Sequence, residues 1–261
     1  MAKIALDKYY TEPELAKYCV EKTFEILGDK WDRIIEPAAG AGAYLEYLPE
    51  DTIAYDIAPD HPSVIKADYR EVELPYMERS LVITNPPFGR ANKLSVQFMI
   101  KSLQHSDYVS FIQPISQLDQ NRTMRNTKLV YSEDLGKIRY SGRLVHCCLN
   151  IYVKDDAPQE SYEIGGIYGR HIFRQGKYKH KDDLLNYPWD FRIAAWGRIR
   201  LLEEGEYADN EVVFRVDDEF KREWLEEALK ECDYDALVKA VTVPNLPIWR
   251  LKKWLYERYN K

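Results

Sequence analysis

The chain has 261 residues, of which 45% are hydrophobic and 31% are charged, and this composition is typical of a globular protein. The length suits one large α/β domain, or one domain with a modest appendage. No run of residues approaches the roughly eighteen apolar positions of a membrane-spanning helix, and the N-terminus lacks the apolar core of a signal peptide. We therefore expect a cytoplasmic protein with no membrane contact.

The four cysteines are Cys19, Cys147, Cys148 and Cys232, and their spacing matches no metal-ligand pattern. We expect buried, unreactive thiols in a reducing compartment, and no metal ion in the protein.

The formal net charge of −6 is unfavourable for binding nucleic acid, but the charge is unevenly distributed. Residues 84–154 hold ten Lys and Arg against four Asp and Glu. Nearby charges count more than distant ones in salt, so a locally basic face can still attract phosphates. The chain also has 20 tyrosines, and tyrosine stacks on bases when it lines a groove.

Helices and strands alternate in the first part of the chain. Residues 12–28 read as a helix, because Thr11 can cap it, Pro13 is early in it and Gly28 follows it. Strands are expected at 33–35, 52–55, 81–84 and 108–112, and helices at 44–48 and 93–104. This alternation predicts a doubly wound, mostly parallel, Rossmann-like α/β sheet of about seven strands.

The later segments are less regular. Residues 113–128 are polar and leave the carboxyl end of a strand, so we expect a loop or a broken helix there. A hairpin at the sheet edge is expected from strands 137–140 and 145–153. Beyond residue 155 the pattern predicts a strand at 211–216 and helices at 219–230 and 247–259. We therefore expect a sheet domain over 1–155 and a small C-terminal region over 156–261, packed on that domain and partly used for recognition.

The most specific motif is Asn85-Pro86-Pro87-Phe88, which follows the fully apolar strand 81–84. The amino nitrogen of adenine is a poor nucleophile, because its lone pair is conjugated with the ring. The Asn85 side chain and the Pro86 carbonyl would accept its two N–H bonds and free that lone pair. Pro86 and Pro87 fix φ and turn the carbonyl outward, while Phe88 offers a flat surface to a base. The alternative is a simple turn, since Asn and Pro favour turns.

A second motif is the glycine-rich turn 36–42 between a strand and the next element. It lets the backbone approach a ligand, although it is not the full dinucleotide fingerprint. Glu36 is placed to hold an ammonium group, and Asp56, at the next strand end, to accept both hydroxyls of a ribose. Ile57 is placed to cover an adenine ring, and Asp68 to accept from its amino group.

In this order, the motifs resemble the amino-methyltransferase family, specifically the DNA adenine-N6 methyltransferases. The matching segments are Glu36–Gly42, Asp56, Asp68-Tyr69 and Asn85–Phe88. The upstream segment Lys8–Pro13 is similar to the family's aromatic-threonine cofactor segment, and its position matches one subgroup. The likeness covers about residues 8–112, and the rest loosely resembles small stand-alone phage and plasmid members.

The resemblance implies a methyltransferase that transfers a methyl group from S-adenosylmethionine to a flipped adenine in double-stranded DNA, leaving S-adenosylhomocysteine. Its implied catalytic residues are Asn85, Pro86, Pro87 and Phe88. Its implied cofactor-binding residues are Tyr10, Thr11, Glu36, Pro37, Ala38, Gly40, Gly42, Asp56, Ile57, Asp68, Tyr69 and Asn85.

The chain has less room for target recognition than large members of that family, so recognition would be compact, loop-based or weakly sequence-specific. The candidate phosphate contacts are Arg122, Arg125, Lys128, Arg139, Arg143, Arg170, Arg174, Lys177, Lys179 and Lys181.

Several alternatives stay open. RNA adenine and protein-glutamine methyltransferases share the Asn-Pro-Pro-Phe/Tyr strip, whereas cytosine-N4 enzymes usually have Ser in place of Asn85. The glycine turn and the basic stretch favour DNA. A non-catalytic, methyltransferase-like nucleic-acid-binding partner is a further possibility. The sequence leaves open the recognition sequence, the oligomeric state and the role in restriction–modification, phage protection or regulation.

Overall fold

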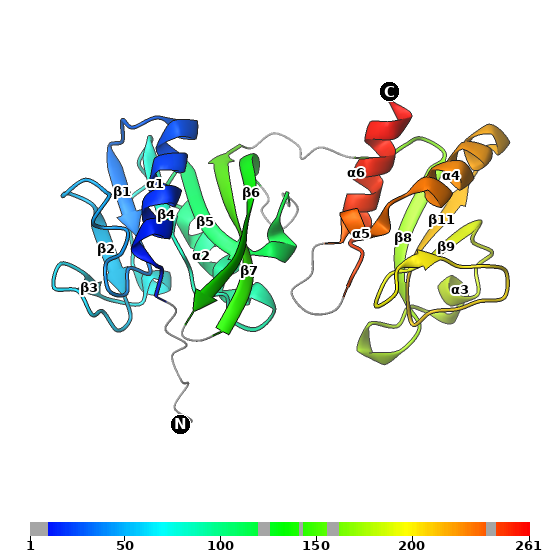
Figure 1. Cartoon of the computed structure of the whole chain (residues 1–261), viewed down its shortest axis with the longest axis horizontal. Helices are drawn as coiled ribbons and strands as arrows, with labels where there is room; N and C mark the ends of the chain where they lie inside the picture. Colours follow the sequence, from blue (N-terminus) through cyan, green and yellow to red (C-terminus); the bar gives the residue numbers. More distant parts are fainter. Residues whose placement is uncertain (1–9, 120–125, 141–142, 156–161, 239–243) are drawn as a thin grey trace. The chain divides into compact units, whose positions relative to one another are not determined.

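A computed structural model describes residues 10–119, 126–140, 143–155, 162–238 and 244–261. The predicted phosphate contacts Arg122 and Arg125 lie outside these residues. The chain forms two compact units, residues 1–159 (unit 1) and residues 160–261 (unit 2) (Figure 1). Each unit is described by itself.

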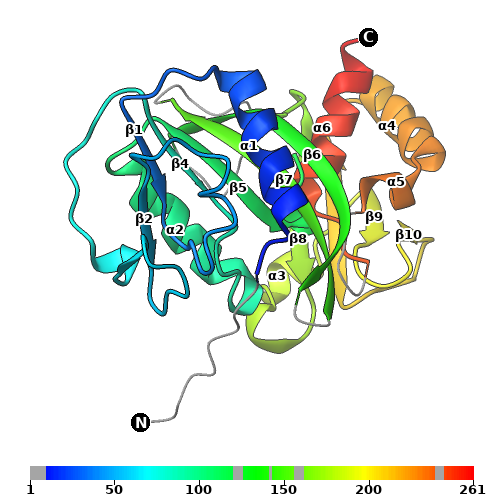
Figure 2. The ribbon, with the colours of Figure 1, turned by 60° about the vertical axis from the view of Figure 1, so that its left-hand side comes forward.

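Unit 1 is built on a seven-stranded sheet with the strand order β3-β2-β1-β4-β5-β7-β6 (Figure 2). Parallel pairing joins β1 (Arg33–Glu36), β2 (Ile53–Asp56), β3 (Ile65–Lys66), β4 (Ser80–Thr84) and β5 (Tyr108–Pro114). The antiparallel strands are β7 (Arg143–Lys154), beside β5, and β6 (Thr127–Tyr140), at the edge. The predicted doubly wound, mostly parallel sheet with an antiparallel edge hairpin is confirmed.

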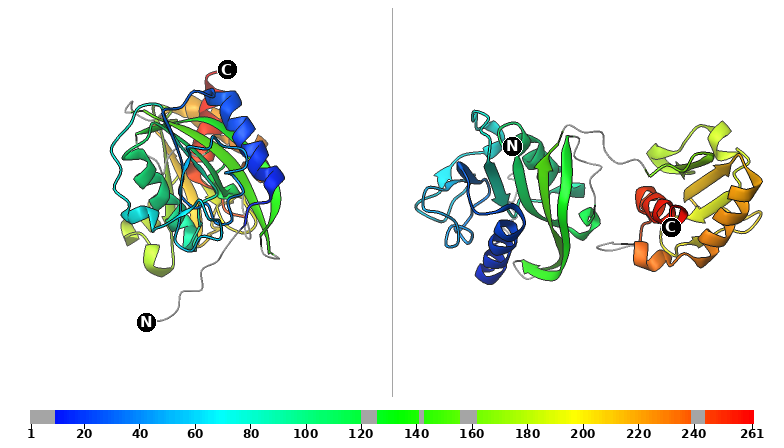
Figure 3. Two further views of the ribbon diagram at one scale, coloured as in Figure 1. Left: turned by 90° about the vertical axis from the view of Figure 1, so that its left-hand side faces the viewer. Right: turned by 90° about the horizontal axis from the view of Figure 1, so that it is seen from above.

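Helices α1 (Pro13–Leu27) and α2 (Lys93–Leu103) lie on opposite sides of this sheet (Figure 3, left). The strand β4 is buried along its whole length, as expected for a parallel strand covered on both faces. Leu81 and Ile83 pack in a cluster with Ala16 of α1. Val82 packs on the other face in a cluster with Met99 of α2.

Two expected elements of unit 1 differ from the structure. The predicted helix 44–48 is a series of turns, in which Leu45 donates to the Gly42 carbonyl and Tyr47 to that of Tyr44, each three residues back. The edge strand starts at Thr127 rather than at residue 137. Of the expected loop 113–128, most described residues therefore belong to the end of β5, to a 3-10 helix over Ile115–Gln117 or to the start of β6. Irregular pairing between Leu129 and Gly136 interrupts the alternation that would have marked this strand.

Unit 2 contains an antiparallel four-stranded sheet with the order β10-β9-β11-β8. Its strands are β8 (Ile167–Phe173), β9 (Phe191–Ala194), β10 (Arg200–Leu201) and β11 (Asn210–Val216). Its α-helices are α3 (Asp182–Leu185), α4 (Glu219–Glu231), α5 (Tyr234–Leu237) and α6 (Ile248–Tyr259). Leu225 and Leu229 of α4 and Leu251 of α6 share one core with Val212 and Phe214 of β11. The helices α4 and α6 therefore cover the same face of this sheet.

The four cysteines are buried free thiols, as expected, and burial raises the pKa of Cys19 to about 12. Within the described ranges, no helix is long and apolar enough to cross a membrane. In the same ranges, no group of three or more His, Cys, Asp or Glu side chains is arranged to hold a metal ion.

Candidate active site

The glycine-rich turn follows β1 and is tied to β2 by a hydrogen bond from the Ala39 amide to the Tyr55 carbonyl, 2.9 Å long. Gly40 and Gly42 have φ of 54° and 85°, in the left-handed region that favours glycine. A Cβ at Gly42 would lie 2.9 Å from ring atoms of His61. Glycine is therefore required at position 42 for both conformation and space.

Glu36 ends β1 and is completely buried beneath this turn. Its Oε1 atom accepts hydrogen bonds from the Ala38 amide, at 3.1 Å, and from the Thr84 hydroxyl. Its Oε2 atom is buried and has no hydrogen-bond partner in the described chain. Burial raises the pKa of this carboxyl to about 8, although both hydrogen bonds act in the opposite direction. The site thus contains a buried carboxyl with one acceptor atom to spare.

Asp56 ends β2 and holds the glycine turn from the side. Its Oδ2 atom accepts from the Gly40 amide at 2.9 Å, and its Oδ1 atom accepts from the Ala58 amide at 2.8 Å. An ionised carboxylate has about four acceptor positions, so both oxygens retain capacity for further hydrogen bonds. The neighbouring Ile57 side chain is 48% exposed, which gives the rim of the turn an apolar surface.

Tyr10 and Thr11, just before α1, reach both motifs. The Tyr10 hydroxyl donates to the Asp60 carboxylate, and the Tyr10 ring lies 3.9 Å from where a Cβ of Gly40 would be. The Thr11 hydroxyl accepts from the Asn85 side-chain amide nitrogen at 3.1 Å. Segments that are distant in sequence therefore meet at the carboxyl ends of β1, β2 and β4.

The Asn85–Phe88 strip leaves β4 in an extended turn. Pro86 is buried, whereas the Phe88 side chain is half-buried against the core on the α1 side. The turn closes at Gly89, whose φ is 65° and whose missing Cβ would lie 2.7 Å from the Leu94 side chain. The motif is consequently an irregular segment between β4 and α2, and Asn85 at its start is joined to Thr11 beside the glycine turn.

Tyr140 is a neighbour of Asn85 that the sequence did not point to. It ends β6 and is buried, and burial raises the pKa of its hydroxyl above the usual value, while the nearby Asn85 side chain acts in the opposite direction. It lies 55 residues beyond Asn85 in the chain, and no local motif marks it. Asp60, which holds Tyr10, was also missed, although it follows Asp56 by only four residues.

Two predicted cofactor residues are engaged elsewhere. The Asp68 carboxylate binds Arg70, whose Nε lies 2.9 Å from Oδ1, and this arginine holds the pKa of Asp68 below its usual value. The Tyr69 side chain is only 1% exposed and its hydroxyl lies 2.7 Å from His105 Nε2. Tyr69 is therefore a core residue with no side-chain surface to offer a ligand, and its expected cofactor contact is corrected.

Most described candidate phosphate contacts are exposed, and they belong to both units. In unit 1, Arg139 is opposite Leu144 at one end of β6, whereas Lys128 is opposite Val153 at the other; Arg143 begins β7. In unit 2, the exposed candidates are Arg170, Lys177, Lys179 and Lys181.

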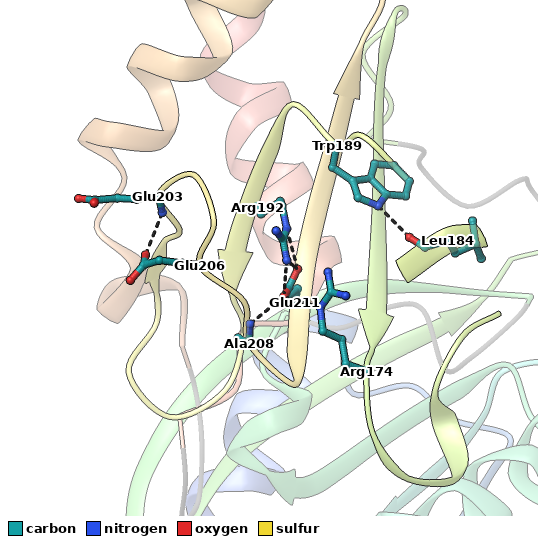
Figure 4. Close-up of polar contacts among 8 residues, drawn as sticks. All are labelled: Arg174, Leu184, Trp189, Arg192, Glu203, Glu206, Ala208 and Glu211. Carbon is teal, nitrogen blue, oxygen red and sulfur yellow. Dashed lines mark hydrogen bonds and ion pairs between the residues drawn. The ribbon is translucent and has the colours of Figure 1, made fainter. Parts of the chain in front are cut away.

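Arg174 needs a correction, because its guanidinium is committed inside unit 2. Its Nε donates to Glu211 Oε1 at 3.0 Å, and Arg192 binds the same carboxylate at 2.8 Å (Figure 4). Glu211 is completely buried and also accepts from the Ala208 amide at 2.8 Å. The Arg174 side chain therefore compensates a buried charge.

Comparisons with known proteins gave fold-level similarity only. No family model matches the chain, and no curated protein matches it. Among solved structures, a Pyrococcus horikoshii protein described as an RNA methyltransferase is 16% identical, with a TM-score of 0.48, covering 59% of this chain and 91% of the other. The M protein of the type I restriction enzyme EcoKI is 14% identical, with a TM-score of 0.44, covering 70% of this chain and 53% of the other.

The 23S rRNA methyltransferase ErmE is also 14% identical, with a TM-score of 0.43, covering 59% of this chain and 73% of the other. Because all three TM-scores are below 0.5, the fold assignment above depends on the strand order and pairing of this chain itself.

Proposed function

We propose that this chain is an S-adenosylmethionine-dependent methyltransferase that modifies the N6 amino group of adenine in DNA. The observation that carries the proposal is the fixed Asn85 amide at the end of β4. Its nitrogen is held by Thr11 at 3.1 Å, so its oxygen is left as an acceptor. The same upstream segment touches the glycine turn through Tyr10.

The residues around the glycine turn fit S-adenosylmethionine. When Glu36 is ionised, its spare Oε2 atom is an acceptor for the ammonium group, so binding of the ammonium would displace the proton that the raised pKa retains near neutral pH. Asp56 is a double acceptor for the ribose hydroxyls. Gly40 and Gly42 let the backbone approach the ligand, and the exposed Ile57 side chain covers one side of the adenine ring. When bound, this cofactor supplies a methyl group on a positively charged sulfur.

The protein's contribution to the chemistry is to prepare the adenine nitrogen. The Asn85 oxygen and the Pro86 carbonyl accept its two N–H bonds, which localises the lone pair and stabilises the positive charge that grows on nitrogen. That lone pair would accept the methyl group that the cofactor supplies, and the nitrogen would then release a proton to water. Phe88 stacks on the base, which contributes about 1–3 kcal/mol.

The two units take different roles in this proposal: unit 1 binds the cofactor and holds the target base, and unit 2 takes part in recognising the polymer. An adenine inside a base stack cannot reach Asn85, so the base must be unpaired or flipped out before transfer. In a duplex, flipping costs a few kcal/mol, whereas a single strand avoids most of that cost.

The test is transfer of tritium from labelled S-adenosylmethionine to unmethylated plasmid DNA, to total RNA and to a protein extract. We expect label in DNA as N6-methyladenine, lost in Asn85→Ala and retained in the matched control Asn186→Ala, an exposed residue of unit 2. Label in RNA alone or in protein alone would show that the substrate is that polymer rather than DNA, and it would leave the proposed amino-group chemistry in place. Failure of the wild-type protein to bind the cofactor would overturn the enzyme assignment.

A further inference from the structure

The helices α4 and α6 cover one face of the sheet of unit 2. Side chains alternate along a strand, so the residues that follow the core positions point to the other face. Val212 and Phe214 of β11 belong to the core under α4 and α6, and Arg215 therefore lies on the opposite face. Tyr168 of β8 is paired with Arg215 across the two strands, so it lies on the same face.

One step further along the sheet, Val213 lies between Arg170 of β8 and Arg192 of β9, again on the face opposite α4 and α6. Two loops add tyrosines to this face. The Arg215 guanidinium donates to the Tyr187 hydroxyl at 3.1 Å, and Arg192 lies over the Tyr207 ring at 4.2 Å. We name this surface the arginine–tyrosine face; its residues are Tyr168, Arg170, Tyr187, Arg192, Tyr207 and Arg215.

The tyrosines of this face are both exposed and held in place. Tyr168 is 50% exposed and Tyr207 is 66% exposed. The Arg215 guanidinium lies over the Tyr168 ring at 4.7 Å, and those of Arg192 and Arg174 lie over the Tyr207 ring at 4.2 and 4.6 Å. A ring that is pinned by a cation and still widely exposed is a ready surface for stacking.

Positive charge predominates on this face. Arg170 is exposed and forms no ion pair with any described residue. The buried Glu211 is shared by two arginines, and Arg215 binds Asp217 at 3.1 Å. Beside the sheet strands, the four arginines Arg170, Arg174, Arg192 and Arg215 thus meet only two carboxylates among the described residues, Glu211 and Asp217. This local excess of positive charge attracts phosphates at short range, although the loop 203–209 and the helix α4 also carry carboxylates.

We propose that the arginine–tyrosine face binds single-stranded DNA, with phosphates at Arg170 and Arg215 and unpaired bases stacked on Tyr168 and Tyr207. The inference depends on the proposed function for the identity of the polymer as DNA, and it deepens that function, because it makes an already unpaired strand the substrate. Such a substrate presents adenine to Asn85 without the cost of opening a duplex.

A duplex fits this face less well for a geometric reason. The bases of a duplex are stacked on each other, so a tyrosine on this face reaches a base plane only after that base is unstacked.

The helix α6 also carries cations, but they are engaged within unit 2. Lys252, Lys253 and Arg258 each pair with a glutamate. This helix therefore offers fewer unpaired cations to a groove of duplex DNA than its sequence suggests.

The test is fluorescence anisotropy of the full chain with labelled oligonucleotides of one sequence, as single-stranded DNA, duplex DNA and single-stranded RNA. We expect single-stranded DNA to bind most tightly. Tyr168→Ala should weaken that binding roughly 5- to 150-fold, as expected for loss of one base stack. Tyr168→Phe should restore most of it, because the ring is kept, and Arg170→Ala should weaken binding and reduce its dependence on salt.

Matched controls lie on the helix-covered side: Phe220→Ala removes a 73% exposed aromatic side chain and Lys230→Ala removes an exposed cation. Both should leave binding unchanged. Circular dichroism of each variant checks that unit 2 is folded. The proposal is overturned if folded Tyr168→Ala binds like the wild type, if duplex DNA binds at least as tightly as the single strand, or if only RNA binds.

These outcomes are separable from those for the proposed function. Asn85→Ala should abolish methyl transfer while leaving oligonucleotide binding intact. If the wild type methylates DNA normally but Tyr168→Ala binds oligonucleotides like the wild type, only the proposal for the arginine–tyrosine face is overturned. Strand binding through Tyr168 with no cofactor binding would overturn only the methyltransferase proposal.

Discussion

The side-chain amide of Asn85 donates a hydrogen bond to the hydroxyl of Thr11, which precedes it by 74 residues, at 3.1 Å. This contact joins the segment before α1 to the end of β4. In this orientation the amide nitrogen faces Thr11, which leaves the Asn85 oxygen as the acceptor that the proposed chemistry needs.

Thr11→Val should therefore reduce methyl transfer, about tenfold, the effect of losing one positioning hydrogen bond. Thr11→Ser keeps the hydroxyl and should retain most activity. Thr52→Val serves as the matched control, because the Thr52 hydroxyl is buried without a hydrogen-bond partner in the described chain. Single-turnover kinetics measure the effect, and equal rates for Thr11→Val and Thr52→Val would show that the contact has no role in positioning.

The buried carboxyl of Glu36 predicts a specific pH dependence of stability. Its pKa is raised to about 8 by burial, so between pH 5 and 8 the folded state holds a proton that the unfolded state has lost. The stabilisation is complete below the unfolded pKa and is lost as pH rises through the folded pKa. Compared with the neutral Glu36→Gln, the wild type should lose stability on going from pH 5 to 8, by at most about 1.4 kcal/mol per pH unit. Urea denaturation at several pH values measures the difference, and parallel curves would contradict a raised pKa.

Gly42→Ala should destabilise unit 1 and abolish cofactor binding. The new methyl group meets His61 at 2.9 Å in a backbone with φ of 85°, which combines left-handed strain of roughly 1–2 kcal/mol with a steric clash. Gly28→Ala is the control, because Gly28 has a similar φ of 89° but nothing lies within 4 Å of the added methyl. Thermal denaturation and equilibrium dialysis with S-adenosylmethionine compare the two variants; if both behaved alike, the contact with His61 would be unimportant.

Glu211→Ala should destabilise unit 2 by about 3–5 kcal/mol, because it leaves Arg174 and Arg192 without their shared counter-ion. Glu206→Ala breaks a comparable ion pair with Arg200, but that pair is exposed, and its loss should have little effect. Both residues are shown in Figure 4. Guanidinium denaturation of the two variants measures the contrast, and a small effect at both positions would mean that solvent replaces the lost carboxylate at Glu211.

The parts of the fold that the sequence predicted are those with strong local patterns. β4 is a continuous apolar run, and such a run identifies a strand buried on both faces. The motif residues at the ends of β1, β2 and β4 could be ordered along one sheet edge, because parallel strands place their carboxyl ends together. The structure brings Tyr10, Gly40 and Asn85 to that edge, and their roles stay predictions.

The failures have physical causes. β8 pairs with β11 about forty residues later, and its Tyr168-Gly169-Arg170-His171 stretch has neither an apolar run nor a clean alternation. The sequence places Tyr69 next to Asp68, but it does not reveal that the Tyr69 side chain points into the core toward His105.

Arg174 is predicted as a phosphate contact for a similar reason. It stands in a basic run, and its partner Glu211 is 37 residues away, so only the folded sheet reveals that its guanidinium is bound to a buried carboxylate.

The glycine turn is braced before any ligand arrives, since Asp56 already accepts from the amides of Gly40 and Ala58. A ligand that enters such a turn finds its backbone already ordered, and it loses little binding free energy to freezing chain motion. Under the proposed function, the same bracing would link two subsites in one side chain, because a change at Asp56 would loosen the turn proposed for the amino-acid end of the ligand and also remove the acceptor proposed for its sugar. Affinity for the two ends of the ligand would then change together.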